Sequence, residues 1–410
     1  MSALPEIAVI LKRGKSKPLW LGHPWIFSGA VHKVRGPVGD TGGPCEVVDE
    51  RGNVLGYGHY NPHGQIAVRL LQHRRTTELD FAPEPFDEIL RARLHQAVAR
   101  RRSVGLPAED TDVFRLVNAE GDLLSGLVVD RLGDVAVAQL GSRAMYDARE
   151  LVASLVRQAA GVRRVALSIN ETASRLEAIP VMHEVYGEGG LDEAPGAVQV
   201  RERGVRFEID LANAQKTGFY ADQRDNRQRF AKLCEGRSVL DAYSYTGGFG
   251  INAALAGATS VVMVDSSKPA IEQAVGNAAL NGVADRITGL HGDAVTFLKE
   301  TQGRGDRFER IVCDPPKLAR GRAHLDDALK KYARINTLAM SALEPGGLLL
   351  TCSCSRHVSP NAFARMLTES GHRLRRSVQV LATWGQPTDH PTLSVAPEGR
   401  YLKAYLVAVA

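Results

Sequence analysis

From about residue 205 onward, short apolar strands alternate with segments of helical pattern. Continuous apolar runs that alternate with helices are typical of a parallel sheet covered by helices on both faces. We expect strands at residues 238–241, 260–265, 286–290, 310–313 and 348–352, and helices at 249–256, 268–281, 326–343 and from 360 onward. This stretch therefore predicts an α/β fold with a mostly parallel sheet.

Polar side chains follow the ends of these strands. Asp241, Asp265, Asp293 and Asp314 each come at or just after a strand end, and Cys352–Cys354 closes the fifth strand. The carboxyl ends of parallel strands meet at one edge of a sheet, and the ligands of such sheets bind there. The sequence thus predicts a ligand site at this edge.

The loop after the first strand favours a nucleotide-like cofactor. Asp241 leads into Ala242–Gly250, whose glycines let the backbone approach a ligand closely. Asp265 follows 24 residues later, and an acid at this distance can accept hydrogen bonds from both hydroxyls of a ribose. These features alone fit a nicotinamide cofactor or S-adenosylmethionine. The rigid Asp314–Pro316 turn favours S-adenosylmethionine, because an acid held at the reactive end suits methyl transfer to a nucleobase and has no use in a dehydrogenase.

The five cysteines differ in their expected surroundings. Their odd number and the lack of Cys-x-x-Cys spacing indicate neither a disulfide framework nor a structural zinc site, so no metal is expected and a reducing cytoplasm fits best. We expect four of them to be buried small apolar side chains, namely Cys45, Cys234, Cys313 and Cys352. Cys354 lies beyond the strand end, with Arg356 and His357 close in sequence to stabilise a thiolate, and it is the candidate nucleophile.

A thiolate at this edge suits the methylation of a pyrimidine at C5. C5 is a weak nucleophile, and attack of a thiolate on C6 creates an enamine whose C5 can take a methyl group from a sulfonium. Asp314 can hydrogen-bond or protonate N3, which stabilises the charge that develops. Loss of the C5 proton and elimination then free the enzyme. Lys317 joins Cys354 and Asp314 as a candidate catalytic residue.

Residues 1–75 are the first of three expected domains, a small all-β module. This segment carries ten basic and five acidic residues, and a second basic cluster follows between Arg91 and Arg102. Such a density indicates the phosphate backbone of a nucleic acid as partner, although charge alone fits a solvated face equally well. The β-rich runs lie between Gly, Pro and Asn turns at residues 7–11, 45–49, 54–58 and 66–71.

Residues 76–190 are expected to form a small α+β linker domain, and residues 191–410 the third domain. Residues 187–204 are interpreted as a boundary loop, and residues 213–224, dense in polar and aromatic side chains, as part of the site. Within this last segment Gln223 and Arg224 are candidates to bind a methionyl carboxylate. The elements expected in the linker are helices at 86–104 and 146–159 and strands at 127–130, 135–140 and 164–169.

Composition limits where the chain can act. Hydrophobic residues make up 44% and charged residues 24%, as in ordinary globular proteins. No apolar run approaches the roughly 18 residues that a membrane span needs, and the N-terminus lacks the layout of a signal peptide. We therefore expect a cytoplasmic protein without a membrane partner, and a homodimer stays open as its oligomeric state.

Several of these motifs together resemble a known family, the RlmI-type large-subunit ribosomal RNA cytosine-C5 methyltransferases. The resemblance spans nearly the whole chain. It implies an N-terminal PUA RNA-binding domain, a small α+β linker domain and a Rossmann-like class I methyltransferase domain that uses S-adenosylmethionine. The matching segments are 213–227, Asp241–Gly250, Val264–Ser267, Asp314–Lys317, Thr351–Ser355, Leu11–Lys15, His23–Ala30, Asp389–Pro391 and Pro397–Lys403.

The resemblance also implies the site residues and the substrate. Cys354 takes the family position of the nucleophile, and the substrate is large-subunit ribosomal RNA, naked or partly assembled, because the target base must leave its stack. Many RNA cytosine-C5 enzymes carry a second cysteine after the proline of the fourth-strand motif. Here Lys317 lies in that neighbourhood, so another base or water takes the C5 proton. The expected cofactor-binding residues are Asp241, Tyr243, Ser244, Tyr245, Thr246, Gly247, Asp265, Ser266, Asp293, Ala294, Asp314, Gln223 and Arg224.

Two other functions stay open. An S-adenosylmethionine-dependent RNA guanine-nitrogen methyltransferase would use the same sheet, but such enzymes usually place an aromatic residue after the Asp/Asn-Pro-Pro turn, where this chain has Lys317. A non-enzymatic RNA-binding or ribosome-assembly factor would have a vestigial cofactor pocket. The complete set of strand-end acids argues against that second alternative.

Overall fold

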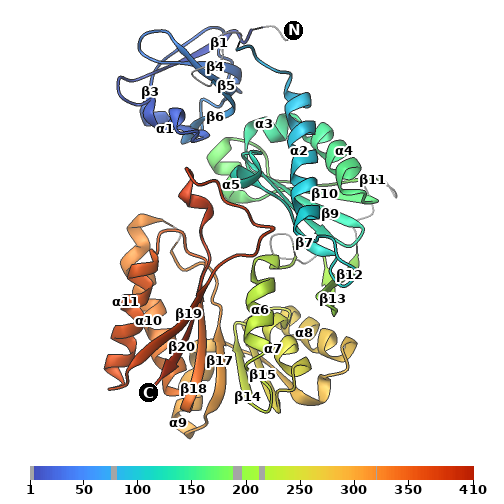
Figure 1. Ribbon diagram of the computed structural model, residues 1–410, viewed down its shortest axis with the longest axis vertical. Helices are drawn as coiled ribbons and strands as arrows, with labels where there is room; N and C mark the ends of the chain where they lie inside the picture. The colour runs from blue at the N-terminus through green and yellow to red at the C-terminus, as the bar shows by residue number, and fades with distance from the viewer. Residues whose placement is uncertain (1–3, 75–80, 188–195, 212–217, 320) are drawn as a thin grey trace. The chain divides into compact units, whose positions relative to one another are not determined.

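The chain folds into two compact units. The structure, a computed structural model, describes residues 4–74, 81–187, 196–211, 218–319 and 321–410 (Figure 1). The first unit consists of Met1–Val198, Asp210–Phe219 and Thr388–Gly399, and the second of Gln199–Ile209, Tyr220–Pro387 and Arg400–Ala410. Each unit is therefore assembled from segments that lie far apart in the sequence.

The first unit contains a six-stranded sheet built from residues near the N-terminus. Its elements are β1 (Ile7–Leu11), α1 (Lys17–Trp20), β2 (Trp25–Phe27), β3 (Val31–Arg35), β4 (Gly43–Val48), β5 (Val54–Tyr60) and β6 (Ile66–His73). The strand order is β2-β6-β5-β4-β1-β3, and only β1 and β4 pair in parallel (Figure 1, blue). Val9, Val47 and Val68 are fully buried in its core. Successive residues of β1 alternate between buried and half-buried, because the side chains of a strand point to opposite faces. The expected all-β module is confirmed.

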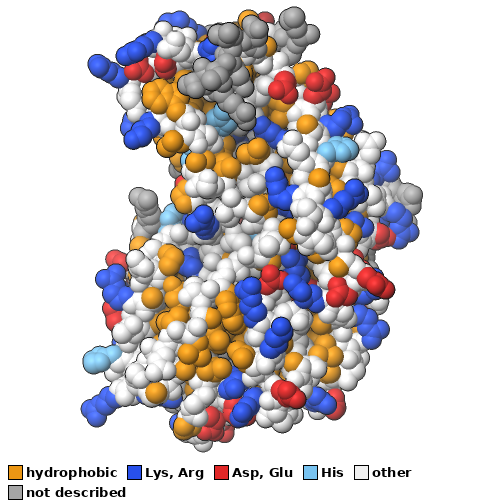
Figure 2. Space-filling model, viewed as in Figure 1, with side chains coloured by type: hydrophobic (Ala, Val, Ile, Leu, Met, Phe, Trp, Pro, Cys, Tyr) orange, Lys and Arg blue, Asp and Glu red, His pale blue; other side chains and the backbone are white. Residues whose placement is uncertain are grey.

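Basic and apolar side chains share the surface of this sheet. Lys12, Arg13 and Lys15, which we call the basic stretch, are exposed between β1 and α1. Trp20 at the end of α1 is also exposed, to 68%. Figure 2 shows Lys and Arg side chains beside apolar ones on the visible face of this part of the molecule.

A five-stranded sheet completes the first unit. Its elements are α2 (Phe86–Ser103), β7 (Val113–Asn118), β8 (Leu127–Leu132), β9 (Val135–Leu140), α3 (Arg143–Asp147), α4 (Arg149–Ala160), β10 (Arg164–Ile169), α5 (Glu171–Glu177) and β11 (Met182–Gly187). The order is β11-β10-β9-β8-β7, with β9 and β10 parallel. Leu90, Leu94 and Ala97 recur every three or four residues, so α2 buries one face in the core. The helices and strands expected at residues 86–169 are confirmed, with small shifts at their ends.

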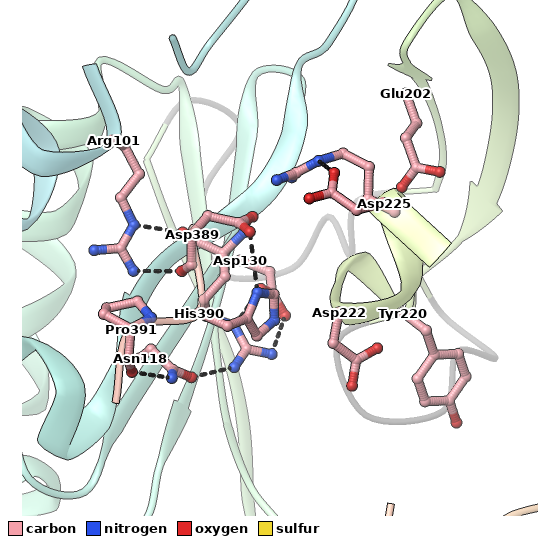
Figure 3. Close-up of polar contacts among 12 residues, drawn as sticks. Arg101, Asn118, Asp130, Glu202, Tyr220, Asp222, Asp225, Asp389, His390 and Pro391 are labelled. Atoms are coloured by element: carbon pink, nitrogen blue, oxygen red, sulfur yellow. Dashed lines mark hydrogen bonds and ion pairs between the residues drawn. The ribbon is translucent and has the colours of Figure 1, made fainter. Parts of the chain in front are cut away.

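A segment from near the C-terminus belongs to this first unit. The guanidinium of Arg101, which is 1% exposed, donates from Nη2 to the carbonyl of Asp389 at 2.7 Å. The Asp389 carboxylate accepts from the Arg115 amide at 3.0 Å, and Asn118 donates to the carbonyl of Pro391 at 2.8 Å (Figure 3). We call Thr388–Gly399 the returning segment, because the chain leaves the second unit to form it and then goes back.

The second unit is centred on a seven-stranded sheet. Its strands are β14 (Ser238–Ala242), β15 (Ser260–Asp265), β16 (Ile287–His291), β17 (Phe308–Cys313), β18 (Leu343–Ser353), β19 (Val378–Trp384) and β20 (Lys403–Val409). The order is β16-β15-β14-β17-β18-β20-β19. The first five in this order run parallel, whereas β20 is antiparallel to both of its neighbours. The five predicted parallel strands are thus confirmed, and two antiparallel strands extend the sheet at one edge.

Helices cover both faces of this sheet. They are α6 (Arg224–Ala231), α7 (Gly248–Leu255), α8 (Lys268–Leu280), α9 (Ala294–Arg304), α10 (Leu325–Ser341) and α11 (Pro360–Arg373). α6, α7 and α8 form one layer, and α9, α10 and α11 form the other (Figure 1). The hydroxyl of Ser359 caps α11 by accepting from the Ala362 amide, and the helix begins at Pro360, the predicted position. This is the Rossmann-like arrangement expected for the C-terminal part.

Short 3₁₀ turns connect several of these elements. They are η1 (Ser28–Ala30), η2 (Ala119–Asp122), η3 (Ala221–Gln223), η4 (Ala284–Arg286), η5 (Arg322–His324) and η6 (Pro397–Gly399). η3 matters most for the site, because it leads directly into α6. No helix among the described residues combines the length and the apolar character needed to cross a membrane.

Two sequence expectations were wrong in detail. The boundary loop expected at 187–204 contains a strand, β12 (Ala197–Glu202), which pairs with β13 (Val205–Asp210). Its residues alternate between exposed and buried, but the Gly- and Pro-rich sequence just before it led to the prediction of a loop. Helix α10 ends at Ser341, before the predicted end at 343, because β18 already begins at Leu343 and its Pro and Gly residues at 345–347 form a bulge opposite Phe308–Arg310. Residues 213–217 of the expected site lining lie outside the described residues.

Candidate active site

The end of β14 and the loop after it hold two buried polar atoms that no described residue pairs. Asp241 is 1% exposed, and its Oδ2 accepts from the Gly250 amide at 2.8 Å. Its Oδ1 has no hydrogen-bond partner among the described residues, and neither has the Oγ of Ser244, which is 6% exposed. Unpaired buried polar atoms are costly, so a pair of them beside a glycine-rich loop fits a polar ligand.

The backbone of this loop is held in an unusual conformation. Tyr243 and Tyr245 have φ angles of 70° and 49°, in the left-handed region that side chains other than glycine seldom adopt. The Tyr245 amide donates to Oδ2 of Asp265 at 2.9 Å, and the Asn277 side chain donates to the carbonyl of Thr246 at 3.3 Å. Gly247, at φ 86°, completes the turn before α7. Strain stored in a fixed loop is common at ligand sites.

The acid at the end of β15 has a structural task as well as its expected one. Oδ1 of Asp265 accepts from the Ser267 amide at 2.9 Å, while Oδ2 holds Tyr245. Each carboxylate oxygen has a second lone pair, so the carboxylate can still accept from ribose hydroxyls. Ser266, next in the chain, is exposed. The role of these residues in binding ribose stays a prediction.

Asp293 begins α9 as its N-cap. Its Oδ1 accepts from the amide and from the hydroxyl of Thr296, at 2.8 and 2.9 Å. Ala294, the first residue of the helix, is buried. The capping role alone accounts for an acidic residue at this position. The contribution of Asp293 to cofactor binding therefore also stays a prediction.

The side chain of Gln223 connects η3 with the end of β17. Its amide nitrogen donates to Oδ2 of Asp314 at 2.9 Å, and its oxygen accepts from Asn226 at 2.6 Å. Gln223 is 2% exposed and Arg224 3% exposed, so both lie inside the site region rather than in a solvated connector. Since the Gln223 amide already has two partners, its main action in this structure is to orient the Asp314 carboxylate.

The cysteines separate into two groups. Cys45, Cys234, Cys313 and Cys352 are each buried, as expected, whereas Cys354 is partly exposed. Burial, reinforced by Asp314, raises the pKa of Cys352 well above the usual range, so its thiol stays neutral. Cys354 comes directly after β18, where the strand opens into a loop. Among the cysteines it is the one that a substrate can reach.

Several ionisable groups of the site act on the Tyr220 phenol, including Asp222, Asp314 and Cys354. Burial raises its pKa most, and the charges of Asp314 and Cys354 raise it further, which places the phenol near both candidate catalytic groups. Its ring lies 5.2 Å from that of Tyr245, edge to face. Lys317, the third candidate catalytic residue, is exposed. Tyr220, just before η3, is therefore close enough to respond to the charges of Asp314 after β17 and Cys354 after β18, while the catalytic roles of these two residues stay predictions.

A buried ion pair fixes Tyr220. Arg227 of α6 binds Glu202 of β12 through Nε and Nη2, at 2.7 and 2.6 Å, and both side chains are almost fully buried. The same Nη2 donates to the carbonyl of Tyr220 at 3.0 Å. Figure 3 shows Tyr220 and Asp222 on the turn that leads into α6.

Residues close to the C-terminus also reach this site. The Tyr401 hydroxyl donates to Oδ2 of Asp222 at 2.8 Å. The ammonium of Lys403 donates to the carbonyls of Ser355 and Tyr401, at 2.9 and 2.8 Å. Tyr220 lies within the predicted site segment 213–224 but was not singled out. Arg227 and Lys403 had no signal beyond their places in the matching segments 213–227 and 397–403.

The site is strongly acidic. Burial raises the pKa of Asp241 to about 7, and the neighbouring Asp314 and Asp265 add to this, while the Gly250 amide opposes it. A ligand with positive charge relieves such an arrangement, because it favours the ionised carboxylate. In the part of the chain that the structure describes, no cluster of three His, Cys, Asp or Glu side chains is arranged to hold a metal ion.

Family models match both ends of the chain. Residues 190–407 match the S-adenosylmethionine-dependent methyltransferase family, and residues 9–73 match a PUA-like domain. The first match covers more than half of the chain and agrees with the sheet, the glycine-rich loop and the strand-end acids described above. The protein is an S-adenosylmethionine-dependent methyltransferase.

Relatives of similar length identify a more specific family within the methyltransferases. Proteins named ribosomal RNA large subunit methyltransferase I are 35% identical in Shewanella denitrificans and 36% in Shewanella frigidimarina, each alignment covering 98% of this chain and 99% of the relative. The Vibrio cholerae protein of this name is 35% identical with the same coverage. The chain belongs to this family.

Solved structures agree on the fold. SMU.776, described as a candidate methyltransferase and crystallised with SAH, superposes with a TM-score of 0.82 at 17% identity, covering 98% of this chain and 99% of that one. A methyltransferase-like protein from Streptococcus mutans gives 0.81 at 18% identity, with the same coverage. At such identities these neighbours support the fold alone.

Proposed function

We propose that this protein transfers a methyl group from S-adenosylmethionine to C5 of a cytosine in large-subunit ribosomal RNA, through a covalent adduct of Cys354. The observation that carries the proposal is that Cys354 is partly exposed while the other four cysteines are buried, and that Cys354 and Asp314 both act electrostatically on Tyr220, Tyr332 and Cys352. The name of the relatives supports ribosomal RNA as the substrate.

Each residue of the site is assigned a different role in the proposed reaction. The Cys354 thiolate adds to C6 of cytosine, and the electron pair of the C5–C6 bond becomes available at C5. Asp314, oriented by Gln223, hydrogen-bonds or protonates N3 and so stabilises the charge on the ring. C5 would then take the methyl group that the bound sulfonium supplies, with breakage of the S–CH3 bond and release of a neutral thioether. A base or water removes the C5 proton, the C6–S bond breaks, and the thiolate is restored. Lys317, exposed after the Pro-Pro turn, is assigned to contacts with the RNA near the reacting base.

The unpaired atoms of the β14 loop suit the cofactor. When bound, S-adenosylmethionine supplies an electrophilic methyl group on its sulfonium. Oδ1 of Asp241 and Oγ of Ser244 are the acceptors that a cationic and hydroxyl-rich ligand can use. The proposed binding set keeps Tyr243, Tyr245, Thr246 and Gly247 of the loop, with Asp265, Ser266, Asp293, Ala294, Asp314, Gln223 and Arg224.

The N-terminal part is proposed to bind the RNA. The basic stretch and the exposed Trp20 offer charge for phosphates and a ring on which a base can stack. The target base must leave its stack at a cost of a few kcal/mol, which is smallest in naked or partly assembled RNA. In this proposal the enzyme acts in the cytoplasm, and its three domains are residues 1–75, 76–190 and 191–410. The proposal allows either a monomer or a homodimer as the oligomeric state.

The test is methylation of naked large-subunit ribosomal RNA by the Cys354→Ala variant. We expect loss of 5-methylcytosine, measured by mass spectrometry of RNA digests, while binding of S-adenosylmethionine is retained in calorimetry. Cys234→Ala is the matched control, because it removes a buried thiol and should leave methylation near that of the wild type.

Each other result selects a different function. Full methylation at C5 by Cys354→Ala would overturn the assigned nucleophile, and Cys352→Ala would then show whether the neighbouring thiol acts. Methylated guanine instead of cytosine would identify a guanine-nitrogen methyltransferase. RNA binding without methylation by the wild type would identify a non-enzymatic RNA-binding factor.

A further inference from the structure

One buried cation in the second unit has no part in the mechanism above. Lys403 begins β20 and is 6% exposed, which is rare for a lysine because burial of an ammonium is costly. Burial lowers its pKa to about 8, and the charge of Cys354 opposes this change. At neutral pH the ammonium is therefore protonated in most molecules.

The strand pairing places this ammonium beside the candidate nucleophile. Lys403 pairs with Ser353 across β18 and β20, and its Nζ donates to the carbonyl of Ser355 at 2.9 Å. The side chain thus reaches from the level of residue 353 to the backbone of residue 355, and the charge of Cys354, which lies between these two residues in the chain, acts on the ammonium. A second bond, to the carbonyl of Tyr401 at 2.8 Å, fixes the position of Nζ.

Other titratable groups face the thiol from four elements. They are Tyr220 before η3, Asp314 after β17, Tyr332 of α10 and Cys352 of β18. Each of these groups is either neutral or an anion, so none of the four favours a negative charge on sulfur. Lys403, on β20, is a buried cation that opposes them, whereas Arg356 is exposed and His357 half-buried in the loop after Cys354.

The loop that carries the thiol is rigid. The Ser355 hydroxyl accepts from the Ala319 amide at 3.1 Å and lies 3.2 Å from the hydroxyl of Tyr332. The Ser355 carbonyl accepts from both Lys403 and the Val358 amide. A cation at a fixed distance from a fixed thiol acts continuously, without a change of conformation.

We propose that Lys403 is a positioning residue that stabilises the thiolate form of Cys354 through the charge of its ammonium group. The thiol proton leaves to water, Lys403 keeps its own proton, and no other bond changes. The inference rests on the proposed function for the purpose of the thiolate, but ionisation of Cys354 can be measured without RNA or cofactor. An adjacent cation populates the nucleophilic form, which is the usual origin of a reactive cysteine.

The test is the pH dependence of Cys354 alkylation by iodoacetamide in the full-length protein, followed by fragment mass spectrometry that separates Cys354 from Cys352. Lys403→Gln can still donate to the two carbonyls but has no charge, and Lys403→Arg keeps the charge. We expect Lys403→Gln to raise the pH of half-maximal alkylation by about one unit or more, since an opposite charge at close range shifts a titration by roughly 1–3 units. Lys403→Arg should restore most of the shift. Lys330→Met, which removes an exposed cation from α10, is the control and should leave the profile unchanged.

Methylation gives a second readout. The kcat of Lys403→Gln should fall about tenfold or more at pH 7 and recover as the pH approaches 9, where the thiol ionises without help. A purely structural role predicts the same loss at every pH. An unchanged alkylation profile in folded Lys403→Gln, or in Lys403→Met if the glutamine variant does not fold, would overturn the proposal.

Failure of this inference and failure of the proposed function give different results. If Lys403 has no such role, the alkylation profiles coincide although Cys354→Ala still lacks 5-methylcytosine. If the C5 reaction is wrong, the profiles still separate although no 5-methylcytosine forms.

Discussion

The carboxyl group of Asp241 is expected to lower the stability of the protein in the pH range where the enzyme works. Its pKa rises from the usual 3.8 to about 7 because of burial and of the neighbouring acids Asp314 and Asp265. A carboxyl group whose pKa is raised in the folded state contributes its full stabilisation when the pH is below its pKa in the unfolded chain. This stabilisation is lost as the pH rises through its pKa in the folded protein. Three pKa units at about 1.4 kcal/mol each give a loss of about 4 kcal/mol at pH 8.

The substitution Asp241→Asn removes this charge and can keep the bond from the Gly250 amide, because the Asn side chain retains an oxygen acceptor. We expect the free energy of unfolding of the variant to exceed that of the wild type by up to about 4 kcal/mol at pH 8. The difference should shrink to about 1 kcal/mol near pH 4.5. Urea unfolding measures it, with Trp384 as the fluorescent probe of the second unit and Trp20 and Trp25 replaced by Phe in every protein compared.

The same variant should bind S-adenosylmethionine roughly 10- to 100-fold more weakly, since a charged hydrogen-bond acceptor contributes about 1.5–3 kcal/mol. Asp327→Asn, an exposed acid at the start of α10, is the control, and its effect should stay within about 0.5 kcal/mol at every pH. A stability difference for Asp241→Asn that does not change with pH would refute the reasoning. A decrease in stability at pH 8 would refute it as well.

Three further perturbations test other parts of the structure. Gly121→Ala should release the returning segment from the first unit, because an added Cβ would lie 1.9 Å from the carbonyl oxygen of Pro391; hydrogen exchange of residues 388–399 should then increase. Arg227→Met should cost about 3–5 kcal/mol in urea unfolding by leaving Glu202 buried without its cation, and adding Glu202→Gln should recover much of this loss; equal instability of the double variant would contradict the argument. Charge reversal of the basic stretch should raise KM for RNA more than it lowers kcat and should flatten the salt dependence of binding, and equal losses in KM and kcat would count against a docking role.

The sequence predicts the parts of this fold that depend on local pattern. The strand at 260–265 and the start of the helix at 360 were predicted correctly because apolar runs, prolines and hydroxyl caps act within a few residues. The edge of the sheet that carries Asp241, Asp265 and Asp314 followed from the rule for parallel strands. The difference between Cys352 and Cys354 also followed, since a strand buried on both faces hides its side chains until it ends.

What the sequence did not predict depends on partners far away in the chain. Tyr220 is held in the site because Arg227 donates to its carbonyl and is itself bound to Glu202. Glu202 lies on a strand that was expected to be a loop. Lys403 reached the site because β20 runs antiparallel to β18, a pairing that no local pattern specifies. Asp389 found its place in the first unit through Arg101 and Arg115, which precede it by more than 270 residues.

The returning segment also imposes an order on biosynthesis. Residues 388–399 leave the ribosome after α2 and β7, which they contact, so Arg101 binds Asp122 but lacks the Asp389 carbonyl until most of the second unit has been translated. N-terminal domains usually fold first during translation, whereas here the last segment of the first unit is translated only after most of the second unit. A nascent chain that stalls before residue 388 therefore leaves two unfinished units, and both become substrates for quality control together.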